Sequence, residues 1–291
     1  MTVAHAPIPL SSKHPSNGFG DLLRSWRRVR RLTQEALAAA AEVSQRHLSC
    51  LEAGRAQPSR EMVLHLAHAL DVPLRERNLL LTAAGFAAAY GHRPLDGPEL
   101  AAVDQAVTLM LDGLGTCPAV AVDRDWNLVR ANRAALAVFA AFVDLERVWA
   151  RIGGADAAPN VFRLLFHPEG LRPAIEGFPR TGRILLERLR REVAADGAWP
   201  GGRALLAELE ALAALGRTGE TWAPTPEPVL TITLVKDDLR LKLFTMLATF
   251  GTAQDVTVQE LRVECFFPAD DRTREHLAAL LDGAREGDAR G

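Results

Sequence analysis

Apolar residues in the first third of the chain recur three or four positions apart and are interrupted by residues that cap helices. Thr33 and Ser44 are suited to begin the second and third helices, a short turn at Val43 joins the two, and Gly54 ends the third. Two helices joined by a tight turn inside a compact all-helical unit are typical of a helix-turn-helix. The predicted helices lie at residues 19–31, 33–42, 45–52, 58–70 and around 79–81.

Beyond residue 92 the pattern changes to a mixture of strands and helices. A strand pair, several helices and then an antiparallel meander predict an α+β domain whose helices pack on one face of a sheet. The strands are predicted at 119–122, 126–131, 229–235, 239–250 and 256–267, and the helices at 99–114, 132–142, 181–195, 203–215 and 273–281.

These patterns divide the chain of 291 residues into two domains, and its length is sufficient for two hydrophobic cores. The ends lack hydrophobic periodicity, so we expect them to be disordered. We expect a disordered arm at 1–17, a helical domain at 18–86, a linker at 87–96, an α+β domain at 97–283 and a disordered tail at 284–291.

Composition excludes several classes of protein. The chain is 48% hydrophobic and 24% charged, which is typical of a globular protein, and no apolar run reaches the roughly 20 residues that span a bilayer. The N-terminal stretch lacks the apolar core of a secretory signal, and three cysteines in no metal-ligand spacing cannot form a complete disulfide framework. We therefore expect a cytoplasmic protein, associated with the bacterial nucleoid, that has reduced thiols and no membrane partner.

The net charge of −2 is unevenly distributed. Residues 1–91 hold 11 Lys and Arg against 7 Asp and Glu, a balance of +4, whereas the remaining 23 basic and 29 acidic residues give −6. The first predicted helix alone carries five arginines. A basic N-terminal domain fits contact with nucleic acid, and the acidic remainder would confine that contact to one part of the chain.

The order of caps and stops in the first domain resembles the XRE-type, lambda-repressor-like family of helix-turn-helix domains. This resemblance implies double-stranded DNA as a partner, with the third helix in the major groove. A helical protein-interaction module of the same fold is the alternative. The matching residues are Leu23, Arg24, Arg27, Leu32, Thr33, Gln34, Glu35, Leu37, Ala38, Val43, Ser44, Leu51, Glu52, Gly54, Arg55, Pro58 and Ser59.

The family also implies roles for individual residues of the third helix. Arg46 suits guanine because a guanidinium can bond both O6 and N7, and Gln45 suits adenine. Ser49 also faces the bases, and Cys50 would contact a thymine methyl group or pack within the domain. The remaining roles follow from the same comparison: Gln34 and Arg55 are expected to contact phosphates, and Arg27 and Glu52 to form a structural ion pair.

One residue departs from the family pattern. Glu42 stands in the turn before the third helix, where the family usually has Gly because the backbone tends toward positive φ. We expect a conformational cost at Glu42 and a negative charge near the DNA-facing turn.

The second domain resembles the MmyB-like ligand-binding domain, a PAS-like fold found attached to XRE-type domains. The resemblance rests on the order of elements and on Pro118, Ala119, Asp123, Trp126, Asn132, Asn160, Arg163, Phe166, His167 and Pro168. It implies a pocket for a small hydrophobic effector such as a fatty acid, with no other cofactor. Candidate ligand residues are Arg130, Arg133 and Arg163 for a carboxylate, and Trp126, Phe139 and Phe162 for the walls; the alternative is that these residues only form the core.

The sequence lacks the motifs of the common enzyme classes. It has no Gly-x-Ser-x-Gly elbow, no phosphate-binding Gly-x-x-x-x-Gly-Lys and no dinucleotide fingerprint, and His65 and His68 have no nearby Cys or carboxylate cluster that would complete a metal site. We expect a non-enzymatic homodimer in which effector binding changes how two first domains address two half-sites. The alternatives are a constitutive dimeric repressor with a purely structural second domain, and a DNA-tethered enzyme.

Overall fold

The protein is described from a computed structural model covering residues 18–153, 158–196, 199–213 and 229–288. The chain forms two compact units that divide between Tyr90 and Gly91, inside the predicted linker 87–96. The predicted arm 1–17 lies outside the described residues.

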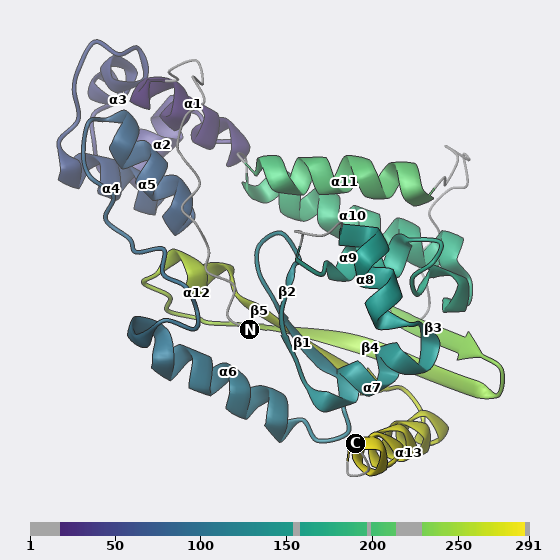
Figure 1. Ribbon diagram of the computed structural model, residues 1–291. Coiled ribbons are helices and arrows are strands. Elements are labelled where there is room, and N and C mark those ends of the chain that lie inside the picture. The colour runs from purple at the N-terminus through teal and green to yellow at the C-terminus, as the bar shows by residue number, and fades with distance from the viewer. Residues whose placement is uncertain (1–17, 154–157, 197–198, 214–228, 289–291) are drawn as a thin grey trace. The chain divides into compact units, whose positions relative to one another are not determined.

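The described part of the N-terminal unit, residues 18–90, has five helices, as predicted (Figure 1). The hydroxyl groups of Thr33, Ser44 and Ser59 accept hydrogen bonds from backbone N–H groups three residues later, which fixes where the second, third and fourth helices begin. Leucines at helical spacing, among them the fully buried Leu23, Leu48 and Leu51, form its core. The helices are α1 (Phe19–Val29), α2 (Gln34–Ala40), α3 (Gln45–Glu52), α4 (Arg60–Ala69) and α5 (Leu74–Ala83).

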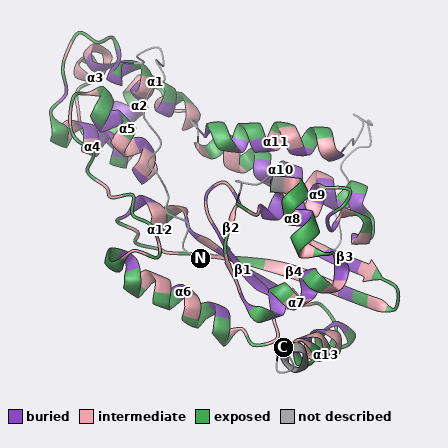
Figure 2. Cartoon of the chain, viewed as in Figure 1, coloured by how far each residue is buried: buried purple, intermediate pink, exposed green. Residues whose placement is uncertain are grey.

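The C-terminal unit is built on an antiparallel five-stranded sheet of order β2-β1-β5-β4-β3. This order pairs the first strand of the domain with the last: β1 lies beside β5, with Ala119 opposite Cys265. β1 is buried along its whole length (Figure 2). The predicted α+β domain with an antiparallel sheet is confirmed. The strands are β1 (Ala119–Val122), β2 (Leu128–Ala131), β3 (Thr231–Lys236), β4 (Leu239–Thr249) and β5 (Arg262–Pro268).

Helices cover both faces of this sheet. Val120 and Val122 of β1 face the main core, whereas Ala119 and Ala121 face a smaller core that α6 closes from the other side. The prediction that helices pack on one face was therefore incomplete, because alternate residues of a buried strand point to opposite faces and both sets here are apolar. The helices are α6 (Ala101–Gly113), α7 (Arg133–Phe142), α8 (Leu145–Gly153), α9 (Val161–Phe166), α10 (Phe178–Asp196), α11 (Pro200–Ala213), α12 (Val256–Glu260) and α13 (Asp271–Asp288), with 3-10 turns η1 (Pro98–Leu100) and η2 (Arg172–Ala174).

Two predicted boundaries are wrong, and two further helices were not predicted. The strand expected at 256–267 begins as helix α12, because Asp255 caps it by accepting a hydrogen bond from Thr257 N, and only then continues as β5. Helices α8 and α9 were not predicted, since each is short. α13 continues into the expected tail 284–291 as far as residue 288, because a glycine such as Gly283 costs a helix only about 1 kcal/mol.

The predicted linker is held by hydrogen bonds on each side of the division. In the N-terminal unit, Oδ1 of Asn78 accepts from the backbone N–H groups of Ala89 and Tyr90 at 2.9 and 3.0 Å. In the C-terminal unit, Arg93 pairs with Asp255 at 2.9 Å, and Val256 N donates to Gly91 O. Residues 89–93 are thus ordered by their own units, unlike a flexible linker.

Candidate nucleic-acid interface and ligand cavity

Helix α3 presents one polar face and buries the other. Gln45 and Arg46 are exposed and Ser49 and Cys50 are half-buried, while Leu48 and Leu51 are completely buried. This division follows from the 3.6-residue period, which puts positions 48 and 51 on the core side. The four predicted base-reading residues therefore lie on the part of the helix that the core leaves accessible.

The C-terminal end of α3 is held by a buried carboxylate. Glu52 is 2% exposed, and its two oxygens accept hydrogen bonds from Nε and Nη2 of Arg27 at 2.6 and 2.9 Å. Gln34 Nε2 donates to the same carboxylate at 2.8 Å, and Arg24 donates to the Glu52 carbonyl at 2.7 Å. Glu52 thus joins α1, α2 and α3, and the ion pair expected between Arg27 and Glu52 is present.

The charge state of this cluster follows from its contacts. Burial alone would raise the pKa of Glu52, but hydrogen bonds from Arg27 and Gln34 and the nearby guanidinium charges hold it below its ordinary value. The same hydrogen bond raises the pKa of Arg27, against the opposing effect of burial. Both groups are therefore charged at neutral pH, and the pair fixes α3 against α1.

The turn before α3 has the positive φ at Glu42 that the resemblance to the helix-turn-helix family implied. Glu42 adopts φ of 50°, in the left-handed region that favours glycine. Of the two predicted phosphate contacts, Arg55 is exposed beyond α3, whereas the amide of Gln34 is already engaged by Glu52. Both phosphate contacts stay predictions.

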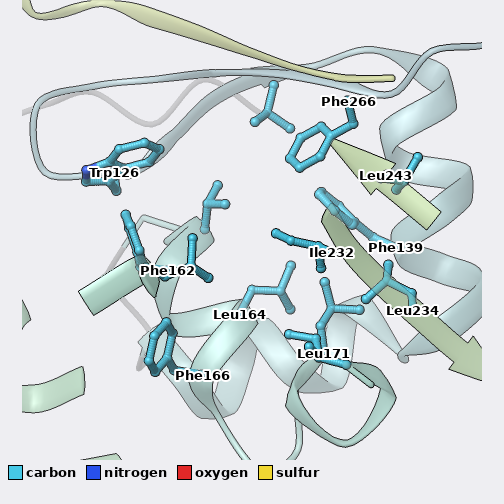
Figure 3. Packing of buried hydrophobic residues seen from close by; sticks show 14 of the residues in the cluster. Trp126, Phe139, Phe162, Leu164, Phe166, Leu171, Ile232, Leu234, Leu243 and Phe266 are labelled. Atoms are coloured by element: carbon cyan, nitrogen blue, oxygen red, sulfur yellow. The ribbon is translucent and has the colours of Figure 1, made fainter. Parts of the chain in front are cut away.

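The C-terminal unit contains an apolar cavity between the sheet and helices α9 and α10. Its volume is about 210 Å³, and a further pocket of about 30 Å³ adjoins it, sharing Val161, Leu165, Ile232 and Phe266. Figure 3 shows Trp126 and Phe162 facing Ile232 and Phe266 across the same space. The larger cavity is lined by Trp126, Val161, Phe162, Leu165, Ile184, Leu185, Arg188, Arg191, Leu230, Ile232, Thr245, Glu264 and Phe266.

Trp126 forms a polar boundary at one end of the cavity. The guanidinium groups of Arg188 and Arg262 lie 4.6 and 5.3 Å from its ring centroid, and its Nε1 donates to Glu192 at 3.1 Å. Trp126 itself adopts φ of 64°, an uncommon conformation for a bulky residue. These contacts hold its indole ring at the cavity wall, edge-on to Phe162 at 4.6 Å between centroids.

The aromatic residues predicted as walls line the cavity or the adjoining pocket, whereas the arginines predicted as anchors lie elsewhere. Trp126 and Phe162 line the larger cavity, and Phe139 lines the smaller pocket. The three arginines line neither space and are engaged elsewhere: Arg130 with Asp104 at 2.6 Å, Arg163 with Glu208 at 2.9 Å, and Arg133 with the Ala284 carbonyl at 3.1 Å. We correct the prediction accordingly: these arginines hold elements of the fold together.

The charged residues at the cavity are ones that sequence reasoning missed. Arg188 and Arg191 are three residues apart on α10, and Glu264 comes from β5. The spacing of the two arginines was a usable signal, because residues three apart lie on the same side of a helix. Nothing in the sequence showed that this side of α10 would meet β5.

No group of three or more His, Cys, Asp and Glu side chains that could hold a metal ion occurs within the described ranges. Among the helices of those same ranges, none is long and apolar enough to cross a membrane. Cys50, Cys117 and Cys265 are free thiols.

Comparison with known families gives two matches. Residues 103–280 match the MmyB-like transcription regulator ligand binding domain, which spans more than half of the chain, and residues 19–80 match a helix-turn-helix domain. The first match contains the cavity and the second contains α3.

Comparison with individual proteins adds little. No curated protein matches the chain. A solved structure described as an RNA-binding light-oxygen-voltage receptor aligns with 94% of this chain at 11% sequence identity and a TM-score of 0.22. The chain spans 65% of the length of that protein.

Proposed function

Because the chain belongs to the family of MmyB-like transcription regulators and carries a helix-turn-helix domain, we propose that a small hydrophobic effector controls its sequence-specific binding to DNA. The observation that carries this proposal is the presence in one chain of an accessible polar face on α3 and an apolar cavity in the C-terminal unit. The first suits base recognition and the second suits a small ligand.

The DNA-reading part of the proposal depends on α3. Arg46 is exposed and can form the bidentate contact with guanine, and Gln45 can do the same with adenine. The network around Glu52 supports this role because it fixes α3 within the domain, so that the reading side chains project from a rigid element.

Substitution of Arg46 tests its base-reading role, and substitution of Arg55 is the matched control. Arg46→Ala should weaken binding to the preferred duplex by about 1–3 kcal/mol and relax specificity at one base position. Arg55→Ala removes the same charge from an expected phosphate contact, so it should weaken all sequences about equally and reduce the salt dependence. An equal loss on all sequences from Arg46→Ala would refute the base-reading role.

The regulatory part of the proposal depends on the cavity. Its walls are mostly apolar, with a few charged groups, so a fatty acid or a molecule of similar chemistry is the effector we propose. A second copy of the chain is the partner we propose, because one helix-turn-helix reads only a few base pairs and two copies read two half-sites. To regulate DNA binding, the effector must bind the DNA-competent arrangement of the dimer with a different affinity from the arrangement that does not bind DNA.

Removal of the effector tests this coupling. Protein stripped of apolar ligands and protein saturated with a fatty acid should differ in DNA affinity, typically by about 5–150-fold for a coupling of this kind. Equal affinities in the two states, with fatty acid shown to bind, would favour the constitutive repressor. The oligomeric state is measured on the same samples by native mass spectrometry.

A further inference from the structure

We propose that the cavity is built for a short anionic amphiphile, with an apolar chain of about eight carbons inside and an acid group bound by Arg191 at the mouth. This inference rests on the proposed ligand-binding role of the C-terminal unit. It adds the size of the ligand, its charge and the residue that anchors it.

The size follows from the volume. The larger cavity and the adjoining pocket measure about 210 and 30 Å³. An apolar cavity of about 150 Å³ holds benzene, a ligand of roughly six carbons, so two spaces of this total size hold an apolar chain on the order of eight carbons. Pockets for drug-sized ligands begin near 300 Å³, so the present cavity is small for a long chain.

The inner boundary explains why a longer chain is excluded. The smaller pocket is closed by residues of the main core, including Phe139, Leu171 and Leu243. Leu243 is 3% exposed and Leu171 is 1% exposed, so both are enclosed within the core. A tail longer than the cavity would have to displace them, and inserting extra methylenes into a packed core costs about 1–3 kcal/mol.

The charge of the ligand follows from the ionic groups that line the cavity. These are Arg188, Arg191 and Glu264. Glu264 is buried at 5% exposure and accepts a hydrogen bond from Arg188 at 2.8 Å, so these two charges compensate each other. Among the described lining residues, Arg191 is therefore the positive charge without a paired carboxylate, and an acid group would neutralise it.

The contacts of Arg188 and Arg191 differ in a way that assigns the anchor. Arg188 is held by Glu264, by Glu192 at 3.2 Å and by the face of Trp126. In the described parts of the chain, Arg191 has no carboxylate within ion-pair distance, and its Nε donates only to a backbone carbonyl one turn earlier, at 3.4 Å. Arg191 is exposed at the mouth, so its remaining donors can bind a ligand without breaking an existing ion pair.

Calorimetric titration of the delipidated full-length protein tests size and charge together. The probes are straight-chain acids from butanoate to tetradecanoate, and octanol as the neutral counterpart of octanoate. Affinity should rise about fourfold with each methylene and stop rising near eight carbons. Octanoate should bind about tenfold or more tightly than octanol, because only the carboxylate can form a charge-assisted, bidentate pair with the guanidinium of Arg191.

The anchor is tested with two variants on the same helix. Arg191→Gln should weaken octanoate by about tenfold and leave octanol unchanged. Arg180→Gln is the control, because Arg180 is also exposed on α10 and lies outside the cavity lining. It should change neither affinity.

The outcomes separate this inference from the proposed function. Affinity that keeps rising to tetradecanoate would overturn the size limit, and equal binding of octanoate and octanol would overturn the charge selection. An unchanged octanoate affinity in Arg191→Gln would overturn the anchor. In each of these cases the cavity still binds an apolar ligand, whereas failure of every probe to bind would refute the proposed effector site itself.

Discussion

Replacement of Glu52 by Gln removes the charge that holds α3 in place while keeping the shape of the side chain. The variant loses the ion pair with Arg27, whose two hydrogen bonds measure 2.6 and 2.9 Å. It also leaves the guanidinium of Arg27, only 13% exposed, without its carboxylate partner. Gln34 can still donate to the new amide oxygen, so the loss is confined to the charged contacts.

The cost is set by the unpaired charge. Removing one partner of a buried ion pair typically costs about 3–5 kcal/mol. Because Arg27 keeps some access to water, we expect the lower end, about 3 kcal/mol for Glu52→Gln. In a domain of 60–100 residues this corresponds to a fall in Tm of more than about 10 °C for the N-terminal unit.

Hydrogen exchange on the full-length chain reports the loss of stability in the N-terminal unit separately from the C-terminal unit. Peptides from α1 and α3 should exchange faster in Glu52→Gln, while peptides from the C-terminal sheet keep their protection. The double variant Arg27→Met with Glu52→Leu should lose less stability than Glu52→Gln, because no buried charge is left unpaired. A cost below about 1 kcal/mol, or a double variant no better than the single one, would refute the role assigned to this pair.

The remaining predictions concern the same domain. Glu42→Gly should stabilise it by about 1 kcal/mol, since φ is 50° there, and Glu42→Ala should give no such gain; thermal unfolding distinguishes them. Gly20→Ala should destabilise the domain by about 1–3 kcal/mol because the added Cβ would lie 2.5 Å from the Leu51 carbonyl oxygen, and an unchanged unfolding midpoint would contradict this close approach. The pKa of Glu52 is depressed in the folded state, so the contribution of Glu52 to the free energy of unfolding should be complete above the ordinary pKa of 4.5 and disappear as pH falls through the folded pKa. Urea titrations at pH 7 and pH 3 measure this loss of stability. The same loss in Glu52→Gln would contradict the assignment.

Much of the fold follows from local signals in the sequence. The caps at Thr33, Ser44 and Ser59 gave three of the helix starts in the N-terminal unit, and each is present as a hydrogen bond. The strands of the C-terminal unit were predictable from their apolar and β-branched residues. The start of β5 was not, because the apolar run from Val256 continues through a helix that Asp255 caps, and hydrophobicity alone does not separate the two.

The candidate sites were predictable to different degrees. The reading face of α3 depends on spacing within one helix, which the sequence contains. The cavity depends on which elements meet at the sheet: Trp126 and Phe162 were identified as walls, but the three arginines predicted as anchors line neither the cavity nor the adjoining pocket. Arg191 and Glu264 lie 73 positions apart, and only the pairing of strands and the packing of α10 bring them to the same cavity.

The central claim is that an effector in the C-terminal unit changes DNA binding by the N-terminal unit. The most direct test selects a preferred duplex from random sequences with the full-length protein and then titrates that duplex with and without saturating octanoate. We predict a selected sequence and a shift in its Kd of about fivefold or more on adding octanoate. No selected sequence, or the same Kd in both titrations while octanoate is shown to be bound, would contradict the account.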